Sequence, residues 1–224
     1  MQRLSIIIPA LNECAAIGPT LACLQAARGR GHEVILVDGG SSDGTPARCT
    51  GQVDRLLFSA RGRARQMNTG AALAQGDVLL FLHADTLAPD DVDRLIAAAL
   101  AQEPGWGHFD VRLSGRQPLL RLVERLMNLR ARLSGIATGD QGLFVPRDWF
   151  MSLGGFPDQP LMEDIVFSKR LKRLGRPHCL KHRLLTSSRR WERHGVVRTV
   201  IKMWWLRAAF FVGVPASRLA RLYD

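Results

Sequence analysis

The sequence has little of several features that mark particular classes of protein. Its four cysteines, Cys14, Cys23, Cys49 and Cys179, match neither a zinc-binding pattern nor a redox Cys-x-x-Cys pair. No apolar run reaches the roughly 18 to 20 residues that span a bilayer, and residues 5–9 are too short for the core of a signal peptide. We therefore expect a cytoplasmic protein with free thiols and without membrane-spanning helices.

Acidic residues are also scarce: 20 Asp and Glu stand against 31 Lys and Arg, which gives a net charge of +11. This excess suggests an anionic partner, such as nucleotide phosphates, anionic lipid head groups or nucleic acid. It is concentrated in the second half, in residues 112–132 and 169–221. A solvated basic face is the alternative interpretation. The chain has no aromatic RNA-binding strand motif and no zinc finger, so we expect no nucleic-acid partner.

The first 113 residues alternate strand and helix signals. Continuous apolar runs at residues 4–8, 34–37 and 78–82 predict strands buried on both faces, and amphipathic segments between them predict helices. This order predicts an α/β fold with a Rossmann-like, mostly parallel sheet and helices on both faces. Residues 109–113 alternate between apolar and polar and predict a half-exposed strand.

The second half has a different pattern, which predicts a C-terminal helical elaboration. Residues 118–133 predict a basic amphipathic helix with a leucine-rich face, and residues 163–174 predict another helix. Residues 178–185 are compatible with a last strand, and residues 195–212 are apolar and aromatic.

Two acidic residues follow predicted strands, Asp38 and Asp85. Ligands of open α/β sheets bind beyond the carboxyl ends of the strands, so the two carboxylates can meet there. Asp38 precedes Gly39 and Gly40, which permit close approach, and it could accept hydrogen bonds from a base or a ribose. Asp85 suits Mg²⁺ or Mn²⁺, which take few carboxylates besides substrate phosphates. Ordinary helix capping is the alternative for both residues.

Three further segments carry charge that suits a phosphate-bearing substrate. Residues 61–65 hold three arginines at a predicted helix start, where side chains and backbone N–H groups can bind phosphate. Residues 163–164 offer carboxylates for a general base or, alternatively, for helix capping. Residues 189–191 offer cations for a diphosphate and an aromatic ring for a sugar face.

Together these segments resemble the family 2 glycosyltransferases, which have the GT-A fold. The resemblance covers most of residues 4–191 and is closest to a small bacterial branch whose metal motif reads His-Ala-Asp, here residues 83–85. The segments that carry it are residues 5–13, 37–45, 76–85, 139–142, 163–164 and 189–191.

The resemblance implies an inverting, metal-dependent transfer from a nucleotide-diphospho-sugar to a hydroxyl acceptor, with Mg²⁺ or Mn²⁺ as cofactor. It assigns the general base to Asp164 and the metal to Asp85. The nucleotide would be bound by Pro9, Ala10, Glu13, Asp38 and Arg63, and the acceptor and diphosphate side by Asp140, Gln141, Glu163, Arg190 and Trp191.

The sequence departs from the family pattern at His83, where an acidic residue is usual, so Asp85 is the motif's sole carboxylate. A non-catalytic nucleotide-sugar-binding protein therefore stays an alternative. Residues 189–191 also lack the Gln of the processive enzymes, which argues against a polymer synthase.

We expect one domain over residues 1–224. In it, residues 1–113 bind the nucleotide-sugar, residues 114–191 bind the acceptor and carry catalysis, and residues 192–224 form the C-terminal helical segment. Trp204, Phe211 and nearby basic residues suggest peripheral contact with the inner face of a membrane. The alternative is a helix packed on the core or in a homodimer.

Overall fold

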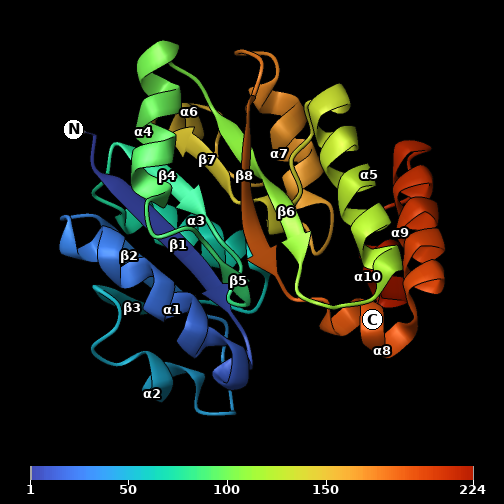
Figure 1. Cartoon of the computed structure of the whole chain (residues 1–224), viewed down its shortest axis with the longest axis horizontal. Coiled ribbons are helices and arrows are strands. Elements are labelled where there is room, and N and C mark those ends of the chain that lie inside the picture. Colours follow the sequence, from blue (N-terminus) through green and yellow to red (C-terminus); the bar gives the residue numbers. More distant parts are fainter. Residues whose placement is uncertain (1, 224) are drawn as a thin grey trace.

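The computed structural model describes residues 2–223, in which an eight-stranded sheet is flanked by helices (Figure 1). The strand order is β3-β2-β1-β4-β7-β6-β8-β5. Pairs β1–β2, β1–β4, β2–β3 and β6–β8 are parallel, and pairs β4–β7, β5–β8 and β6–β7 are antiparallel. The strands are β1 (Leu4–Ala10), β2 (Glu33–Asp38), β3 (Arg55–Phe58), β4 (Val78–Phe81), β5 (Thr86–Leu87), β6 (Gly107–Leu113), β7 (Leu143–Pro146) and β8 (His178–Thr186).

The continuous apolar runs form strands because both faces of the sheet are covered. In β1, Ile6 and Ile8 pack on one face with helices α1 (Cys14–Gly29) and α4 (Val92–Gln102). Ile7 points to the other face, where it packs with α3 (Arg63–Leu73), α6 (Arg147–Ser152) and α7 (Glu163–Leu171). The predicted α/β architecture with helices on both faces is confirmed.

Helix α3 approaches the sheet closely because Gly70 has no side chain. A Cβ atom on Gly70 would lie 2.6 Å from Cγ2 of Ile7 and 3.1 Å from Cγ2 of Val37. This close contact brings the first turn of α3, with Arg63 and Gln66, beside the carboxyl ends of β1 and β2.

The prediction of a half-exposed strand at residues 109–113 is wrong. Phe109 and Val111 are fully buried, and within this segment only Arg112 is exposed. The alternation of apolar and polar residues gave a wrong prediction because β8 pairs with β6 and helix α5 (Pro118–Ser134) covers β6. The polar Asp110 therefore points into protein rather than into water, where it pairs with Arg132 of α5.

Helix α5 forms as predicted, but its leucine-rich face does not pack on the core. Asn128 faces the sheet, where its amide exchanges two hydrogen bonds with the backbone of Val111, at 2.9 and 3.0 Å. Glu124 likewise accepts a hydrogen bond from the Leu113 N–H. The leucines lie exposed on the remaining surface of the helix, at Leu119, Leu122, Leu126, Leu129 and Leu133.

The C-terminal residues form the predicted helical elaboration. Helix α8 (Arg189–His194) leads into α9 (Val196–Phe211), which runs alongside α5, and α10 (Ala216–Tyr223) packs against α9 (Figure 1). Leu206 and Leu219 are buried together with Ile165 of α7. In residues 2–223 we find no helix with both the length and the apolar character that a membrane crossing requires.

Candidate active site

Asp38, at the end of β2, has one carboxylate oxygen held by the backbone and one left free. Its Oδ2 accepts hydrogen bonds from the N–H groups of Gly40 and Ser41, both at 2.8 Å. Its Oδ1 is buried and has no hydrogen-bond partner among the described residues. Because a buried, unpaired polar atom is costly, this oxygen is suited to a donor supplied by a ligand, such as a base N–H or a ribose hydroxyl.

The strand ends beside Asp38 are fixed by Gln66 of α3. Its Nε2 donates hydrogen bonds to the carbonyls of Ala10 at 2.7 Å and Val37 at 2.8 Å. Gly39 lies directly over this amide, since a Cβ there would be 3.0 Å from it. Pro9 and Ala10, which the resemblance places at the nucleoside, therefore end β1 beside Asp38.

The loop after Asp38 is anchored by Asp43 to the start of α1. Asp43 Oδ2 accepts a hydrogen bond from Cys14 N–H at 2.9 Å, and Oδ1 accepts one from Thr45 N–H at 3.0 Å, where α2 (Thr45–Cys49) begins. Hydrogen bonds, first from the Thr45 hydroxyl and next from Cys14, lower the pKa of Asp43. The carboxylate of Asp43 is therefore occupied by the fold, which leaves Asp38 for a ligand.

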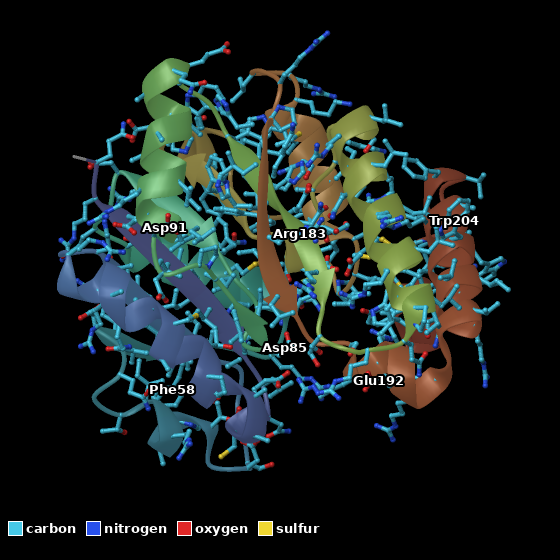
Figure 2. The ribbon with its side chains drawn as sticks, viewed as in Figure 1. Phe58, Asp85, Asp91, Arg183, Glu192 and Trp204 are labelled. Carbon is cyan, nitrogen blue, oxygen red and sulfur yellow. The ribbon has the colours of Figure 1, made fainter. Side chains whose placement is uncertain are left out.

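Asp85 and Glu13 share one cation. Nη2 of Arg189 lies 3.0 Å from Oδ2 of Asp85 and 3.0 Å from Oε2 of Glu13. Two carboxylate oxygens thus converge on one point, at the end of the sheet where Figure 2 labels Asp85. Such a pair fits a Mg²⁺ or Mn²⁺ ion that takes its other ligands from phosphates and water. Residues 2–223 contain no cluster of three or more His, Cys, Asp or Glu that would hold a metal unaided.

His83, the departure from the family's metal motif, lies against Gly139. A Cβ on Gly139 would be 2.4 Å from Nε2 of His83, and that nitrogen is buried without a partner in the described part of the chain. Burial, and next the positive charge of Arg63, lowers the pKa of His83, so the imidazole is neutral at pH 7. A neutral ring could donate to or accept from a ligand at this position.

Asp164 joins the start of α7 to the short helix η1 (Gly139–Gln141). Its Oδ2 accepts a hydrogen bond from Gly139 N–H at 2.8 Å, and its Oδ1 accepts one from Ile165 N–H at 2.7 Å. Each oxygen keeps a second lone pair. Because both bonds come from the backbone, the carboxylate is held in a fixed direction toward the cavity that it lines with Asp140.

Glu163 and Gln141 are buried and act on the surrounding structure. Glu163 lies 3.4 Å from Nη1 of Arg63, and burial raises its pKa against the opposing attraction of Arg63. The side-chain oxygen of Gln141 accepts hydrogen bonds from the N–H and hydroxyl of Thr138, both at 3.0 Å. Neither Glu163 nor Gln141 lines the cavity; they fix its walls.

In the segment 189–191, the three side chains make different contacts, and Arg190 and Trp191 both line the cavity. The guanidinium of Arg190 stacks 3.5 Å from the ring centre of Tyr223 and donates to its carbonyl. Arg189, to which the resemblance gave no separate role, makes the contact with Asp85. Trp191 packs beside Val196 and lines the cavity. Adjacent arginines on one short helix point in different directions, and the sequence alone does not say which one meets the carboxylates.

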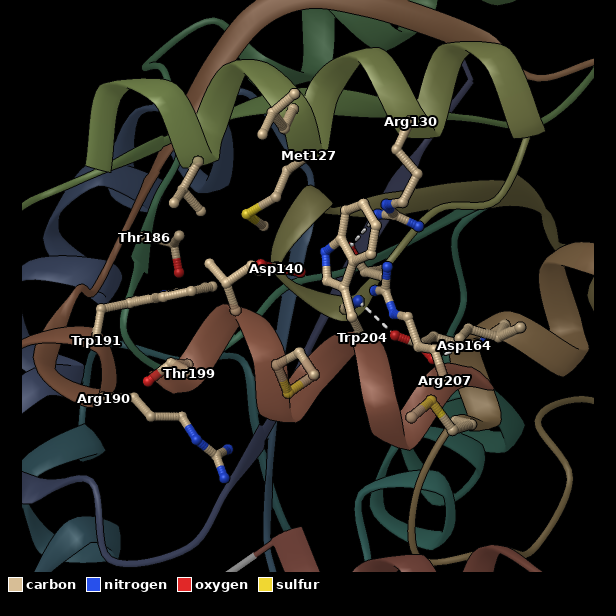
Figure 3. Close-up of a pocket in the computed structure, with 18 of the residues that line it drawn as sticks. Met127, Arg130, Asp140, Asp164, Thr186, Arg190, Trp191, Thr199, Trp204 and Arg207 are labelled. Carbon is tan, nitrogen blue, oxygen red and sulfur yellow. Dashed lines mark hydrogen bonds between the residues drawn. The ribbon is translucent and has the colours of Figure 1, made fainter. Parts of the chain in front are cut away.

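One cavity of about 980 Å³ connects most of these groups. Arg63, Asp85, Asp140 and Asp164 are among the residues that line it. It continues between α5 and α9, from which Arg130 and Arg207 reach into it (Figure 3). These two arginines were also missed, because nothing in the sequence brings residues 130 and 207 together.

The chain is similar to known glycosyltransferases in sequence and in fold. The family model Glycosyl transferase family 2 matches residues 5–133. The beta-monoglucosyldiacylglycerol synthase of Synechocystis is 27% identical over 192 residues, which cover 75% of this chain and 40% of the relative. The undecaprenyl-phosphate 4-deoxy-4-formamido-L-arabinose transferase of Klebsiella pneumoniae is 27% identical over 157 residues, which cover 63% and 47%. The chain thus spans less than half the length of each of these two relatives.

Solved structures share the fold at lower identity. TarS of Staphylococcus aureus in complex with UDP superposes with a TM-score of 0.66 at 19% identity, covering 83% of this chain and 60% of that one. A mannosyltransferase of Pyrobaculum calidifontis in complex with GDP-Man and Mn²⁺ gives a TM-score of 0.62 at 23% identity, covering 82% and 56%.

Proposed function

Because the chain belongs to glycosyl transferase family 2 and has the GT-A fold, we propose that it moves a sugar from a nucleotide-diphospho-sugar to a hydroxyl acceptor. The observation that carries the proposal is the placement of carboxylates at three positions. Asp38 has a free oxygen at the strand ends, Asp85 converges with Glu13, and Asp164 faces the cavity that Asp85 also lines. The position of Asp38 suits a nucleoside, that of Asp85 suits a diphosphate, and that of Asp164 suits an acceptor.

The donor is bound at the carboxyl ends of β1 and β2. Oδ1 of Asp38 accepts a hydrogen bond from the base or the ribose, and Pro9 and Ala10 line the nucleoside beside it. Arg63, whose side chain reaches the cavity, faces the base or the phosphates. Two solved neighbours support a nucleotide donor, since one is in complex with UDP and the other with GDP-Man.

Asp85 and Glu13 would hold Mg²⁺ or Mn²⁺. The bound cation would neutralise charge on the departing diphosphate. Arg189 occupies the point where the two carboxylates converge, and its side chain is 57% exposed, so it is free to exchange partners when a cation or a diphosphate enters. The Mn²⁺ in one structural neighbour supports a divalent metal.

Asp164 is the general base. It removes the proton of the acceptor hydroxyl, and the resulting oxygen nucleophile forms a bond to the anomeric carbon from the face opposite the leaving group. The carbon–oxygen bond to the diphosphate breaks, and its electron pair leaves with the nucleoside diphosphate. This in-line displacement inverts the anomeric centre. The two backbone hydrogen bonds of Asp164 hold the carboxylate in place for the proton transfer.

The acceptor side is formed by Asp140 and Trp191, which line the cavity, and by groups that hold its walls. Gln141 fixes η1, Glu163 orients Arg63, and Arg190 ties α8 to the last helix. In this division, residues 1–113 bind the donor and residues 114–191 carry the acceptor and the base. In the C-terminal segment that begins at residue 192, side chains between Thr199 and Tyr223 line the cavity.

We further propose a cytoplasmic location at the inner face of a membrane. The two relatives described above are named for products or acceptors that contain a lipid, diacylglycerol in one and undecaprenyl phosphate in the other. The exposed Ile201 and Trp205 on α9 support contact with such a surface.

A non-catalytic nucleotide-sugar-binding protein is the second candidate, favoured by the contact of Arg189 with Asp85. Release of nucleoside diphosphate from a panel of UDP- and GDP-sugars with Mn²⁺ separates the two, since water replaces the unknown acceptor. The proposed transferase releases the diphosphate, and Asp164→Asn lowers that rate about 100-fold or more while nucleotide binding persists. The exposed Asp158→Asn serves as the matched control. A wild-type protein that binds a nucleotide-sugar without turnover would favour the second candidate.

A further inference from the structure

The far part of the cavity, between α5 and α9, extends well beyond the carboxylates. We infer that it binds a lipid acceptor: its hydrocarbon chain lies between the two helices, a phosphate lies at Arg130 and Arg207, and the hydroxyl that receives the sugar lies at Asp164. This inference rests on the proposed function and names the substrate class of the same site.

The walls of this part are apolar on both sides. Helix α5 contributes Leu126 and Leu129, and α9 contributes Trp204 and Phe211. The residues are 47%, 52%, 69% and 60% exposed, respectively, although each is large and apolar. Facing apolar surfaces of this extent on a monomer mark a binding site rather than ordinary surface. A sugar or a small polar metabolite would leave these walls without a partner, whereas a hydrocarbon chain would cover them.

The leucine face of α5 is available for this purpose because the helix meets the sheet through its other side. Asn128 and Glu124 hold α5 to β6 by hydrogen bonds to the backbone. The exposed leucines therefore contribute little to holding α5 against the sheet. A ligand in the cavity would explain why these leucines face it.

Two arginines stand where the apolar walls meet the carboxylates. Nε of Arg130 and Nε of Arg207 are both buried and have no hydrogen-bond partner within residues 2–223. Burial, and next the like charge of Arg207, lowers the pKa of Arg130 to about 10. Figure 3 shows the two side chains reaching into the same region from opposite helices, near Asp164. A phosphate would pair with both guanidinium groups and supply the missing acceptors.

One cavity therefore brings together the kinds of group that a phospholipid would need. Apolar side chains of α5 and α9, the arginine pair, and the carboxylates of Asp140 and Asp164 all line it. A lipid in which a phosphate links the hydrocarbon to a hydroxyl-bearing head group would satisfy each part at once.

The outer side of α9 is apolar as well, which favours a lipid that arrives from a membrane. Ile201 and Trp205 are 64% and 54% exposed there, beside the basic side chains of Arg198 and Lys202. An apolar helix surface with nearby cations suits the interface of an anionic bilayer. The far part of the cavity, the groove between α5 and α9, would then open toward the lipids.

The experiment measures lipid binding without a donor. Dioctanoyl phosphatidylglycerol, kept below its micelle concentration, is titrated into the full chain in a calorimeter. Leu129→Gln and Arg207→Gln should each weaken binding about ten-fold or more, because one change removes a groove wall and the other a phosphate contact. The controls are Leu174→Gln and Arg94→Gln, exposed residues outside the cavity, which should bind as the wild type does. Leu129 is half exposed, so its change spares the core, and circular dichroism checks the fold of each variant.

Three results would overturn the inference. In the first, the groove variants bind the phospholipid as tightly as the controls do. In the second, inorganic phosphate binds as tightly as the phospholipid, which would leave an anion site without a lipid chain. In the third, sedimentation shows a dimer that Leu129→Gln dissociates, which would make a second copy of the chain the occupant. Nucleotide-sugar turnover is measured on the same preparations, so lipid binding without turnover would count against the proposed function and not against the groove.

Discussion

Arg189 contacts Asp85 and Glu13 through a single nitrogen atom, at 3.0 Å from each carboxylate. The guanidinium therefore sits where a divalent cation would meet the same two oxygens. The hydrogen bond to Glu13 raises the pKa of Arg189 most. Burial opposes this rise, and the hydrogen bond to Asp85 adds to it, so the pKa is raised overall. Because its side chain is largely exposed, we expect the pair to be weak enough to exchange for a metal ion or a diphosphate.

The first prediction concerns this competition. Arg189→Ala should tighten Mn²⁺ binding about two- to five-fold, because it removes a cation whose exposed ion pairs are worth at most about 1 kcal/mol. Electron paramagnetic resonance of free Mn²⁺ measures the change. Arg193→Ala, on the exposed surface of the same helix, should leave the affinity unchanged. Weaker Mn²⁺ binding in Arg189→Ala would contradict the competition.

The second prediction concerns the free oxygen of Asp38. In Asp38→Asn, an amide oxygen can keep the bonds to Gly40 and Ser41 and leave an NH₂ group in the place of Oδ1. This NH₂ group is a hydrogen-bond donor and would face the N–H or O–H group of the base or ribose, which is also a donor. The affinity for the nucleoside diphosphate should therefore fall about ten-fold or more. Calorimetry with UDP and GDP measures it. Unchanged affinity for both nucleotides would place the nucleoside elsewhere.

The third prediction concerns the contact of α3 with the sheet. Gly70→Ala should lower the free energy of unfolding by about 1 to 3 kcal/mol, because the added methyl group would meet Ile7 at 2.6 Å. Urea denaturation measures this. The control is Gly29→Ala at the end of α1, where a Cβ meets nothing within 4 Å, and which should be neutral or slightly stabilising. Equal stabilities of the two variants would show that α3 can move away from the sheet.

The fourth prediction concerns pH. Asp93 accepts hydrogen bonds from Arg30 at 2.8 Å and from His32 at 2.9 Å. Burial alone would raise the pKa of Asp93. The two partners, Arg30 first, outweigh burial and lower this pKa to about 2. A lowered carboxyl pKa means stability that is present above pH 4 and is lost as the pH falls toward 2. The contribution is about 2 kcal/mol.

Asp93→Asn should therefore lower stability at pH 7 and flatten the loss of stability between about pH 4 and pH 2. Unfolding in urea at several pH values measures both effects. Asp91→Asn, an exposed neighbour, is the control. The same slope in Asp93→Asn as in the wild type would assign the acid transition to other groups.

The sheet could be predicted from sequence where the chain carries its own signal. The runs that became β1, β2 and β4 are apolar apart from Ser5, and the acidic residues that follow them lie at one end of the sheet whatever the details of packing. The exposure of β6 could not be predicted, because it depends on β8, which comes some 70 residues later in the chain. The alternation of apolar and polar residues predicts that a segment is a strand, but it does not predict which elements cover that strand.

The site shows the same division. Asp38 and Asp85 have a local signal, a carboxylate directly after a strand, and the structure brings both to the expected edge. The contact of Arg189 with Asp85, and the meeting of Arg130 with Arg207, join segments about 77 to 104 residues apart. Only the folded chain determines which of several nearby arginines reaches a given carboxylate.

Nucleotide binding in the presence and absence of Mn²⁺ tests the central claim most directly. Thermal shifts of the wild type and of Asp85→Asn are measured with UDP, GDP and their sugar conjugates, since a ligand of the native state raises the melting temperature. A transferase with its metal at Asp85 should show a Mn²⁺-dependent rise with one nucleotide that is largely lost in Asp85→Asn. No rise with any nucleotide, or an equal rise in Asp85→Asn, would contradict the assignment of donor and metal to this site.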